Sequence, residues 1–243
     1  MGHEYSPRWR TTAVAILRPL LFALMKRDWK GRENVPGEGG VIIAANHLSW
    51  SDPLALGHFV YESGRFPVYL AKSGLFHAKV VGPILTKLGQ IPVYRDRAEA
   101  AQALSAAEEA LRAGECLMFY PESTCTRDPE LWPMSGQTGV ARLALTTGAK
   151  VVPVAHWGAH ELWPYGTKRF RPFPRKTMRI LAGPPIDMSA YEGRPLTKET
   201  LRAATDDIMR TIAAQLGELR GETPPDELYD HHKAVQERRS RLE

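Results

Sequence analysis

Residues 41–53 read VIIAANHLSWSDP and decide the fold class. Val41 to Ala45 form a continuous apolar run of strand length, which is typical of a strand buried on both faces of a parallel sheet. Asp52 and Pro53 are typical of a helix start, with Asp52 at the N-cap and Pro53 at the first helical position. The stretch therefore predicts a buried strand, a short polar loop and a helix.

The same alternation of strands and helices continues along the chain. Apolar runs predict strands at residues 67–71, 91–94, 116–120, 151–155 and 178–182. Helix-forming stretches predict helices at residues 98–112, 139–147 and 196–219. Strands that alternate with helices predict an α/β domain with a mostly parallel central sheet flanked by helices. We expect this domain over residues 31–220, followed by a charged C-terminal tail at 221–243.

The composition is that of a globular protein. The 243 residues are 43% hydrophobic and 24% charged, which excludes a disordered or collagen-like chain. Two cysteines, Cys116 and Cys125, are too few for a disulfide framework, so we expect free thiols in a reducing compartment. Residues 1–32 carry seven basic and two acidic side chains, which accounts for the whole net charge of +5. A basic end on a neutral body indicates a docking surface.

The N-terminal segment contains the apolar stretch AVAILRPLLFALM at residues 13–25. It is shorter than the roughly 20 residues that cross a bilayer, and no cleavage site follows it, so we expect neither a transmembrane helix nor a signal peptide. Basic flanks and two bracketing tryptophans, Trp9 and Trp29, favour a helix in residues 1–30 that lies in the membrane interface. A core helix packed on the domain fits the periodicity equally well.

His47 and Asp52 are the first candidates for chemistry, because ligands collect at the carboxyl ends of strands in an open α/β sheet. Five positions apart, they would point to different faces of one helix, so the chain must turn between them. In one interpretation, His47 is a general base and Asp52 accepts a hydrogen bond from its imidazole. In the other, Asp52 only caps its helix and His47 satisfies backbone groups.

Three further motifs each follow an apolar run. They are GQIPVYR at residues 89–95, FYPEST at 119–124 and VVPV at 151–154. Together with NHLSWSDP at 46–53, and in this order, they resemble the four blocks of the PlsC-type glycerolipid acyltransferases over about residues 30–190. The resemblance implies that His47 and Asp52 are catalytic. It also implies substrate-binding roles for a second set of residues, namely Arg95, Glu122, Ser123, Thr124 and Arg127.

The reaction that the resemblance implies is phosphatidic acid synthesis. A fatty acyl group moves from acyl-CoA or an acyl-carrier protein to the sn-2 hydroxyl of 1-acylglycerol-3-phosphate, with neither a metal nor another cofactor. The expected partners are the thioester donor, the lysophospholipid acceptor and an anionic membrane surface, and no nucleic acid. The expected location is peripheral, on the cytoplasmic side of the cell membrane.

The chain departs from the family pattern at three positions. Ser123 stands where glycine is usual, Cys125 where arginine often stands, and Gln137 where lysine often stands. Two cations that hold a phosphate are therefore missing, which leaves open a different glycerolipid or glycolipid acceptor, or a non-catalytic lipid-binding module. Cys125 also allows an alternative mechanism, in which its thiol is a nucleophile activated by His47. The resemblance favours direct transfer of the acyl group instead.

Two other features allow more than one interpretation. His156 and His160 have a spacing that binds metal on a helix, but Gly158 between them favours a loop. Residues 162–186 hold six basic side chains and no acidic one, interleaved with aromatic residues. Among three interpretations of this segment, we favour a binding site for CoA phosphates, an acidic carrier protein or anionic lipid. A solvated loop ranks second, and a nucleic-acid surface ranks last.

Overall fold

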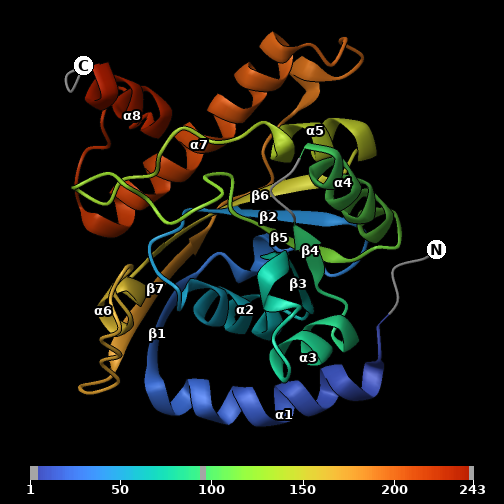
Figure 1. Ribbon diagram of the computed structural model, residues 1–243, viewed down its shortest axis with the longest axis vertical. Helices are drawn as coiled ribbons and strands as arrows, with labels where there is room; N and C mark the ends of the chain where they lie inside the picture. The colour runs from blue at the N-terminus through green and yellow to red at the C-terminus, as the bar shows by residue number, and fades with distance from the viewer. Residues whose placement is uncertain (1–4, 94–96, 241–243) are drawn as a thin grey trace.

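The computed structural model describes residues 5–93 and 97–240. Within them lies a seven-stranded sheet of order β1-β7-β6-β2-β5-β3-β4 (Figure 1). The strands are β1 (Met25–Lys30), β2 (Val41–Ala45), β3 (Pro67–Lys72), β4 (Ile91–Val93), β5 (Cys116–Phe119), β6 (Lys150–Trp157) and β7 (Lys176–Ala182). Neighbouring strands are parallel except β6 and β7, which are antiparallel. The predicted α/β fold with a mostly parallel sheet is confirmed.

Helices cover both faces of the sheet. They are α1 (Pro7–Leu24), α2 (Asp52–Glu62), α3 (Val81–Lys87), α4 (Arg97–Arg112), α5 (Gly139–Thr147), α6 (Ala159–Leu162), α7 (Lys198–Arg220) and α8 (His231–Ser240). Figure 1 shows α4, α5 and α7 on one side of the sheet, and α2 and α3 on the other with α1 outside them. β2 is buried on both faces: Ile42 packs in the cluster with α4, α5 and α7, and Ile43 packs with α2.

One strand lies inside the segment that the sequence assigned to the docking helix. Met25–Lys30 forms β1, which pairs in parallel with β7 at one edge of the sheet. Its sequence, MKRDWK, is charged and mostly exposed, so no apolar pattern marks it as a strand. Pairing with a distant segment defines β1, and the central sheet therefore begins before residue 31.

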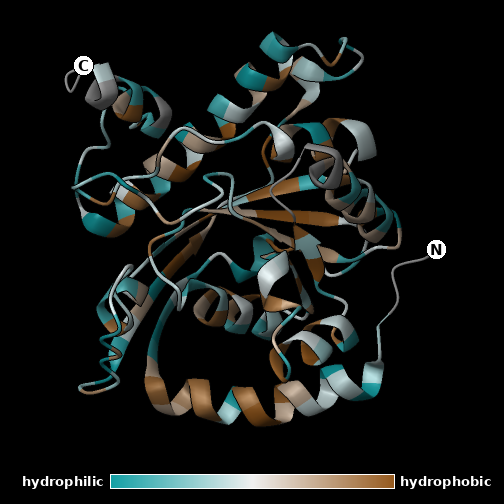
Figure 2. Cartoon of the chain, viewed as in Figure 1, coloured by the Kyte–Doolittle hydropathy of each residue, from teal (hydrophilic) through white to brown (hydrophobic). Residues whose placement is uncertain are grey.

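Helix α1 continues through Pro19 and ends at Leu24. Arg10 anchors its first half, because Nη1 lies 3.0 Å and 3.1 Å from the two carboxylate oxygens of Glu115. Arg175 anchors its end by donating to the carbonyl oxygen of Met25 at 2.8 Å. The outer side of the helix is apolar (Figure 2), with Ile16 63% and Leu20 50% exposed. Across the described residues, no helix combines the length and the apolar character that a membrane span needs.

Candidate active site

The loop between β2 and α2 brings the imidazole of His47 against the carboxylate of Asp52. Nδ1 of His47 lies 2.7 Å from Oδ2 of Asp52, because the chain turns between the two residues. Asp52 is fully buried, whereas the side chain of His47 is 16% exposed. The imidazole is thus held on one side by a buried carboxylate and retains access to solvent.

Asp52 does not cap its helix. The N-cap of α2 is Ser51, and Asp52 is the first helical residue, so the predicted N-cap is wrong by one position. The carboxylate points back along the chain, where Oδ2 accepts the backbone N–H groups of Leu48 at 2.5 Å and Ser49 at 2.8 Å. Asp52 therefore holds the loop that carries His47.

The electrostatics of the pair favour an ionised carboxylate. Burial works to raise the pKa of Asp52, but the nearby imidazole of His156 and the hydrogen bond from His47 outweigh it, so the pKa lies below its usual value. An ionised carboxylate only accepts hydrogen bonds, so Nδ1 of His47 carries the proton and Nε2 is left as the acceptor. His156 is itself fixed, because its Nε2 lies 2.7 Å from the carbonyl oxygen of Asn46.

Glu122 ties two loops together. Its Oε1 accepts the backbone N–H of His47 at 2.8 Å, and its Oε2 accepts the N–H of Met134 at 2.9 Å. Burial raises the pKa of Glu122 to about 8, while these two donors favour its charged form. The structure thus gives Glu122 a bracing contact with His47 that the sequence did not indicate. Its substrate-binding role stays a prediction.

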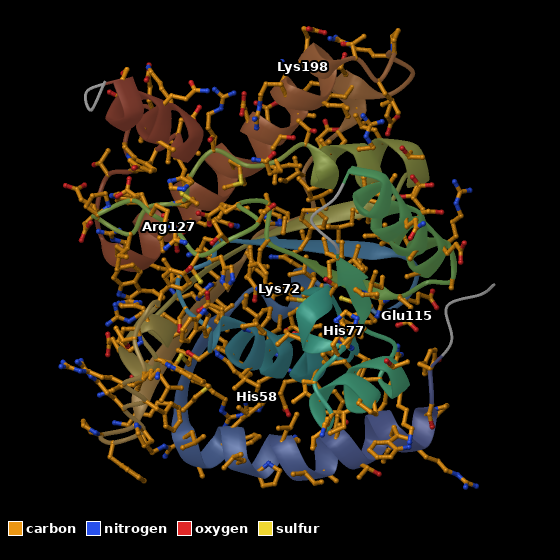
Figure 3. The ribbon with its side chains drawn as sticks, in the orientation of Figure 1. His58, Lys72, His77, Glu115, Arg127 and Lys198 are labelled. Carbon is orange, nitrogen blue, oxygen red and sulfur yellow. The ribbon has the colours of Figure 1, made fainter. Side chains whose placement is uncertain are left out.

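The other predicted substrate-binding residues lie around this loop. Ser123 is exposed at φ 59°, the left-handed conformation that favours glycine, and this explains why glycine is usual at the position. Thr124 is half-buried next to it. Arg127, labelled in Figure 3, stacks on the ring of Tyr165 and donates to its hydroxyl oxygen at 2.7 Å. Arg95 lies outside the described residues, so its role stays a prediction.

Cys125 packs directly against the imidazole. Its Sγ lies 3.5 Å from Nε2 and 3.7 Å from Nδ1 of His47, so it contacts the ring at similar distances from both nitrogens and is not aligned with one of them. Burial, followed by the charges of Asp52 and Glu122, raises the pKa of the thiol far above its usual value. Tyr120 stacks on the same ring, with centroids 4.2 Å apart. A protonated thiol in this position is a packing group, which disfavours the nucleophile hypothesis.

The two histidines considered for metal binding do not share a helix. His156 lies in β6, whereas His160 lies in α6, which begins at Ala159. In the described parts of the chain, no three side chains of His, Cys, Asp or Glu are grouped to hold a metal ion. Nε2 of His156 is instead within hydrogen-bond distance of the backbone carbonyl oxygen of Asn46.

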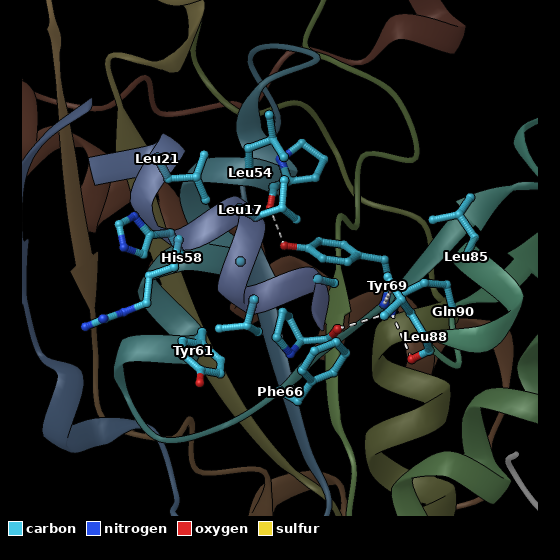
Figure 4. A pocket seen from close by; sticks show the side chains of 16 residues that line it. Leu17, Leu21, Leu54, His58, Tyr61, Phe66, Tyr69, Leu85, Leu88 and Gln90 are labelled. Atoms are coloured by element: carbon cyan, nitrogen blue, oxygen red, sulfur yellow. Dashed lines mark hydrogen bonds between the residues drawn. The ribbon is translucent and has the colours of Figure 1, made fainter. Parts of the chain in front are cut away.

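An apolar cavity of about 250 Å³ lies beside the first turns of α2 (Figure 4). Its walls come from α1, α2, β3, α3 and the residues just beyond them, including Leu17, Leu54 and Leu85. Tyr69 borders it and donates from its hydroxyl to the carbonyl oxygen of Pro53 at 2.6 Å, one residue after Asp52. Segments far apart in the sequence build this cavity, so no single stretch of sequence predicted it.

The fold and the site define a class of protein. An imidazole held by a buried carboxylate, at the carboxyl end of a central parallel strand, suits the removal of a proton from a bound substrate. The sequence profile of the family described as Acyltransferase matches residues 26–157, which include this site and β1 except Met25. The chain belongs to this acyltransferase family, in agreement with the PlsC-type pattern of its motifs.

Named relatives agree with this assignment. The chain is 29% identical over 184 residues to a 1-acyl-sn-glycerol-3-phosphate acyltransferase of Bacillus subtilis, covering 74% of this chain and 83% of that protein. It is 27% identical over 150 residues to a chloroplastic enzyme of the same name from Brassica napus, covering 61% of this chain but only 42% of the relative. The crystal structure of the lysophosphatidate acyltransferase PlsC from Thermotoga maritima matches with a TM-score of 0.68 at 23% identity. That match covers 89% of this chain and 83% of the other, and it supports the fold.

Proposed function

We propose that the protein transfers a fatty acyl group from a thioester to the sn-2 hydroxyl of 1-acylglycerol-3-phosphate, with His47 as general base. The single observation that carries the proposal is the 2.7 Å contact between His47 and Asp52 at the end of β2. The names of the relatives from Bacillus subtilis and Brassica napus support the acceptor.

In the proposed mechanism, Nε2 of His47 takes the proton of the acceptor hydroxyl. The oxygen then attacks the thioester carbonyl, and the resulting imidazolium returns the proton to the departing thiolate. Asp52 holds the proton on Nδ1 and stabilises the imidazolium while it exists. Glu122 accepts a hydrogen bond from the backbone N–H of His47, and this contact keeps the imidazole in place through both steps.

The apolar cavity supports a fatty chain as part of the substrate. Its lining is almost entirely carbon, since the side chains around it include Leu21, Phe66 and Leu88 (Figure 4). An acyl chain gains by burial there, at about 25 cal/mol per Å² of apolar surface removed from water. Pro53, the residue after Asp52, is part of its lining, which supports a chain bound near the catalytic loop.

The acceptor is the part of the proposal that most needs a test. Cys125 and Gln137 replace two basic residues of the family pattern, so another glycerolipid or a glycolipid acceptor is the second candidate. Thiol release from acyl-CoA should be measured with no acceptor, with lysophosphatidate and with uncharged monoacyl lipids. Release that depends on lysophosphatidate supports the proposal, and release with another lipid alone supports the second candidate. Binding of lipid without release supports a non-catalytic module.

We also propose that α1 attaches the protein to the cytoplasmic face of the cell membrane as a peripheral protein. The outer face of α1 supports this, because Ile16 and Leu20 are exposed beside basic residues such as Arg8 and Lys26. The double substitution Ile16→Glu with Leu20→Glu should weaken sedimentation with anionic vesicles by about tenfold or more. Val235→Glu on α8 is the matched control, because Val235 is an exposed apolar residue elsewhere. Equal binding of both variants would contradict the proposal.

A further inference from the structure

A second pocket, separate from the apolar cavity, opens beside the catalytic loop. Its volume is about 570 Å³, and Leu48 and Thr126 form part of its wall. Leu48 directly follows His47, and the backbone N–H of Thr126 donates to the carbonyl oxygen of His47 at 2.7 Å. Other lining residues belong to the basic segment at 162–186, namely Tyr165, Arg171 and Lys176. The pocket thus joins the loop that carries the proposed base to the segment with six cations.

The six cations of that segment have different surroundings. Arg175 donates to the carbonyl oxygens of Phe22 and Met25 at the end of α1. Arg179 donates to the carbonyl oxygen of Leu219 at 3.5 Å. Lys168 and Arg169 are exposed and do not line the pocket. Arg171 and Lys176 do line it, and within the described residues neither head group has a hydrogen-bond or ion-pair partner.

The rest of the lining also suits an anion. His160 lines the pocket as well, but its Nδ1 is buried and contributes no donor at the pocket surface. Arg127 lies beside the pocket, because its guanidinium is on the ring of the lining residue Tyr165. Glu161 is the one acidic residue among the residues described as lining this pocket. Two uncommitted cations and a neighbouring arginine are donors that a phosphate prefers.

We infer that this pocket is a phosphate-binding subsite, in which Arg171 and Lys176 hold a phosphate group of one of the two substrates. The inference rests on the proposed function and identifies residues outside the four family motifs. It also accounts for the neutral residues Cys125 and Gln137, because two cations next to the same loop supply the charge that those positions lack. The phosphate comes either from the CoA part of the donor or from the lysophosphatidate acceptor.

The test compares two charge-matched double variants. One is Arg171→Gln with Lys176→Gln, and the control is Lys168→Gln with Arg169→Gln on the same segment but outside the pocket. The pocket variant should raise the KM of one substrate by about tenfold or more, with kcat nearly unchanged, because a charge-assisted phosphate contact is lost. The control should leave both KM values within about twofold.

The two sources are separated by varying one substrate at a time. A raised KM for acyl-CoA alone, absent when acyl-dephospho-CoA is the donor, assigns the subsite to the 3′-phosphate of the donor. A raised KM for acyl-CoA that persists with acyl-dephospho-CoA assigns it to the diphosphate. A raised KM for lysophosphatidate alone assigns it to the acceptor. If the active pocket variant has the wild-type KM values for both substrates, the inference is wrong.

Direct binding separates this inference from the proposed function. Calorimetry with CoA and with glycerol 3-phosphate needs no turnover and uses the full-length protein and both double variants. If the wild-type protein transfers no acyl group, but binds either probe about tenfold more tightly than the pocket variant does, the proposed function fails and the subsite stands. Equal affinities for the wild-type protein and the pocket variant overturn the subsite. Circular dichroism of each variant shows that the fold is retained.

Discussion

The catalytic loop and the interface between α1 and α2 are built in opposite ways. In the loop, directional hydrogen bonds hold each reacting group: Asp52 accepts from His47 and from two backbone N–H groups, and Glu122 accepts from two more. Between α1 and α2 the contacts are mainly apolar apart from the ion pair of Arg18 with Glu62, and among the described residues the buried His58 there has no hydrogen-bond partner for either nitrogen. Directional bonds set the position of atoms, whereas apolar packing sets only the shape of a space. Substitutions in the two regions should therefore fail in different ways.

The largest effect is expected for His47→Ala. Loss of the general base should lower kcat by about 10²- to 10⁴-fold, because no other described group is placed to take the proton. The protein should still fold, but its melting temperature should fall somewhat, because the buried carboxylate of Asp52 loses one hydrogen-bond partner. The measurement is thiol release with lysophosphatidate, and His77→Ala is the control because His77 is exposed outside the site (Figure 3). Near-normal turnover would remove His47 from the mechanism.

Asp52→Asn should lower both activity and stability. An amide cannot hold the imidazole in the reactive tautomer, so we expect kcat to fall by about 10²-fold or more. It also replaces a fully buried acceptor of two backbone N–H groups, which costs about 1–3 kcal/mol. Kinetics and thermal unfolding measure the two effects, with Asp206→Asn as control, because the side chain of Asp206 is 41% exposed and lies outside the site. A lower melting temperature with unchanged kcat would show that Asp52 is only structural.

His58 should make the α1–α2 region sensitive to acid. Burial among Phe22, Trp29 and neighbouring groups lowers the pKa of His58 below the usual 6.5, although the charge of Glu62 opposes the shift. Between the two pKa values the unfolded chain binds more protons, so stability rises with pH there and is lost as pH falls below about 6.5.

The variant His58→Leu removes this titration. As the pH falls from about 7.5 to about 5, the melting temperature of the variant should rise relative to that of the wild-type protein. The reason is that the variant has no buried imidazole that must stay neutral. The exposed His77→Leu serves as the control and should follow the wild-type profile. An identical pH profile for His58→Leu and the wild-type protein would show that His58 does not contribute.

The smallest effect is expected for Cys125→Ser. Since the thiol is protonated and only packs against the imidazole, kcat should stay within about threefold of the wild-type value. Mass spectrometry after incubation with acyl-CoA alone should detect no acylated Cys125. The variant Cys116→Ser controls for the general cost of placing a hydroxyl in the core. A covalent acyl adduct on Cys125, together with an inactive Cys125→Ser, would establish the thiol nucleophile instead.

Local sequence determined the strands β2 to β7, the helices α2, α4, α5 and α7, and the loop that carries His47. An apolar, β-branched run such as Val41–Ala45 favours a strand covered on both faces, and Pro53 favours a helix start directly after it. The proximity of His47 and Asp52 followed from the same short stretch, because only a turn between strand and helix separates them.

Only the tertiary structure decided the features that join distant segments. β1 is a strand because β7 lies beside it, Glu122 braces His47 across 75 positions of sequence, and Cys125 reaches the imidazole from a different loop. The cavity and the basic pocket likewise need walls from several elements. Sequence patterns report how one segment meets solvent or core, whereas these contacts depend on which segments meet each other, and packing of the whole chain determines that.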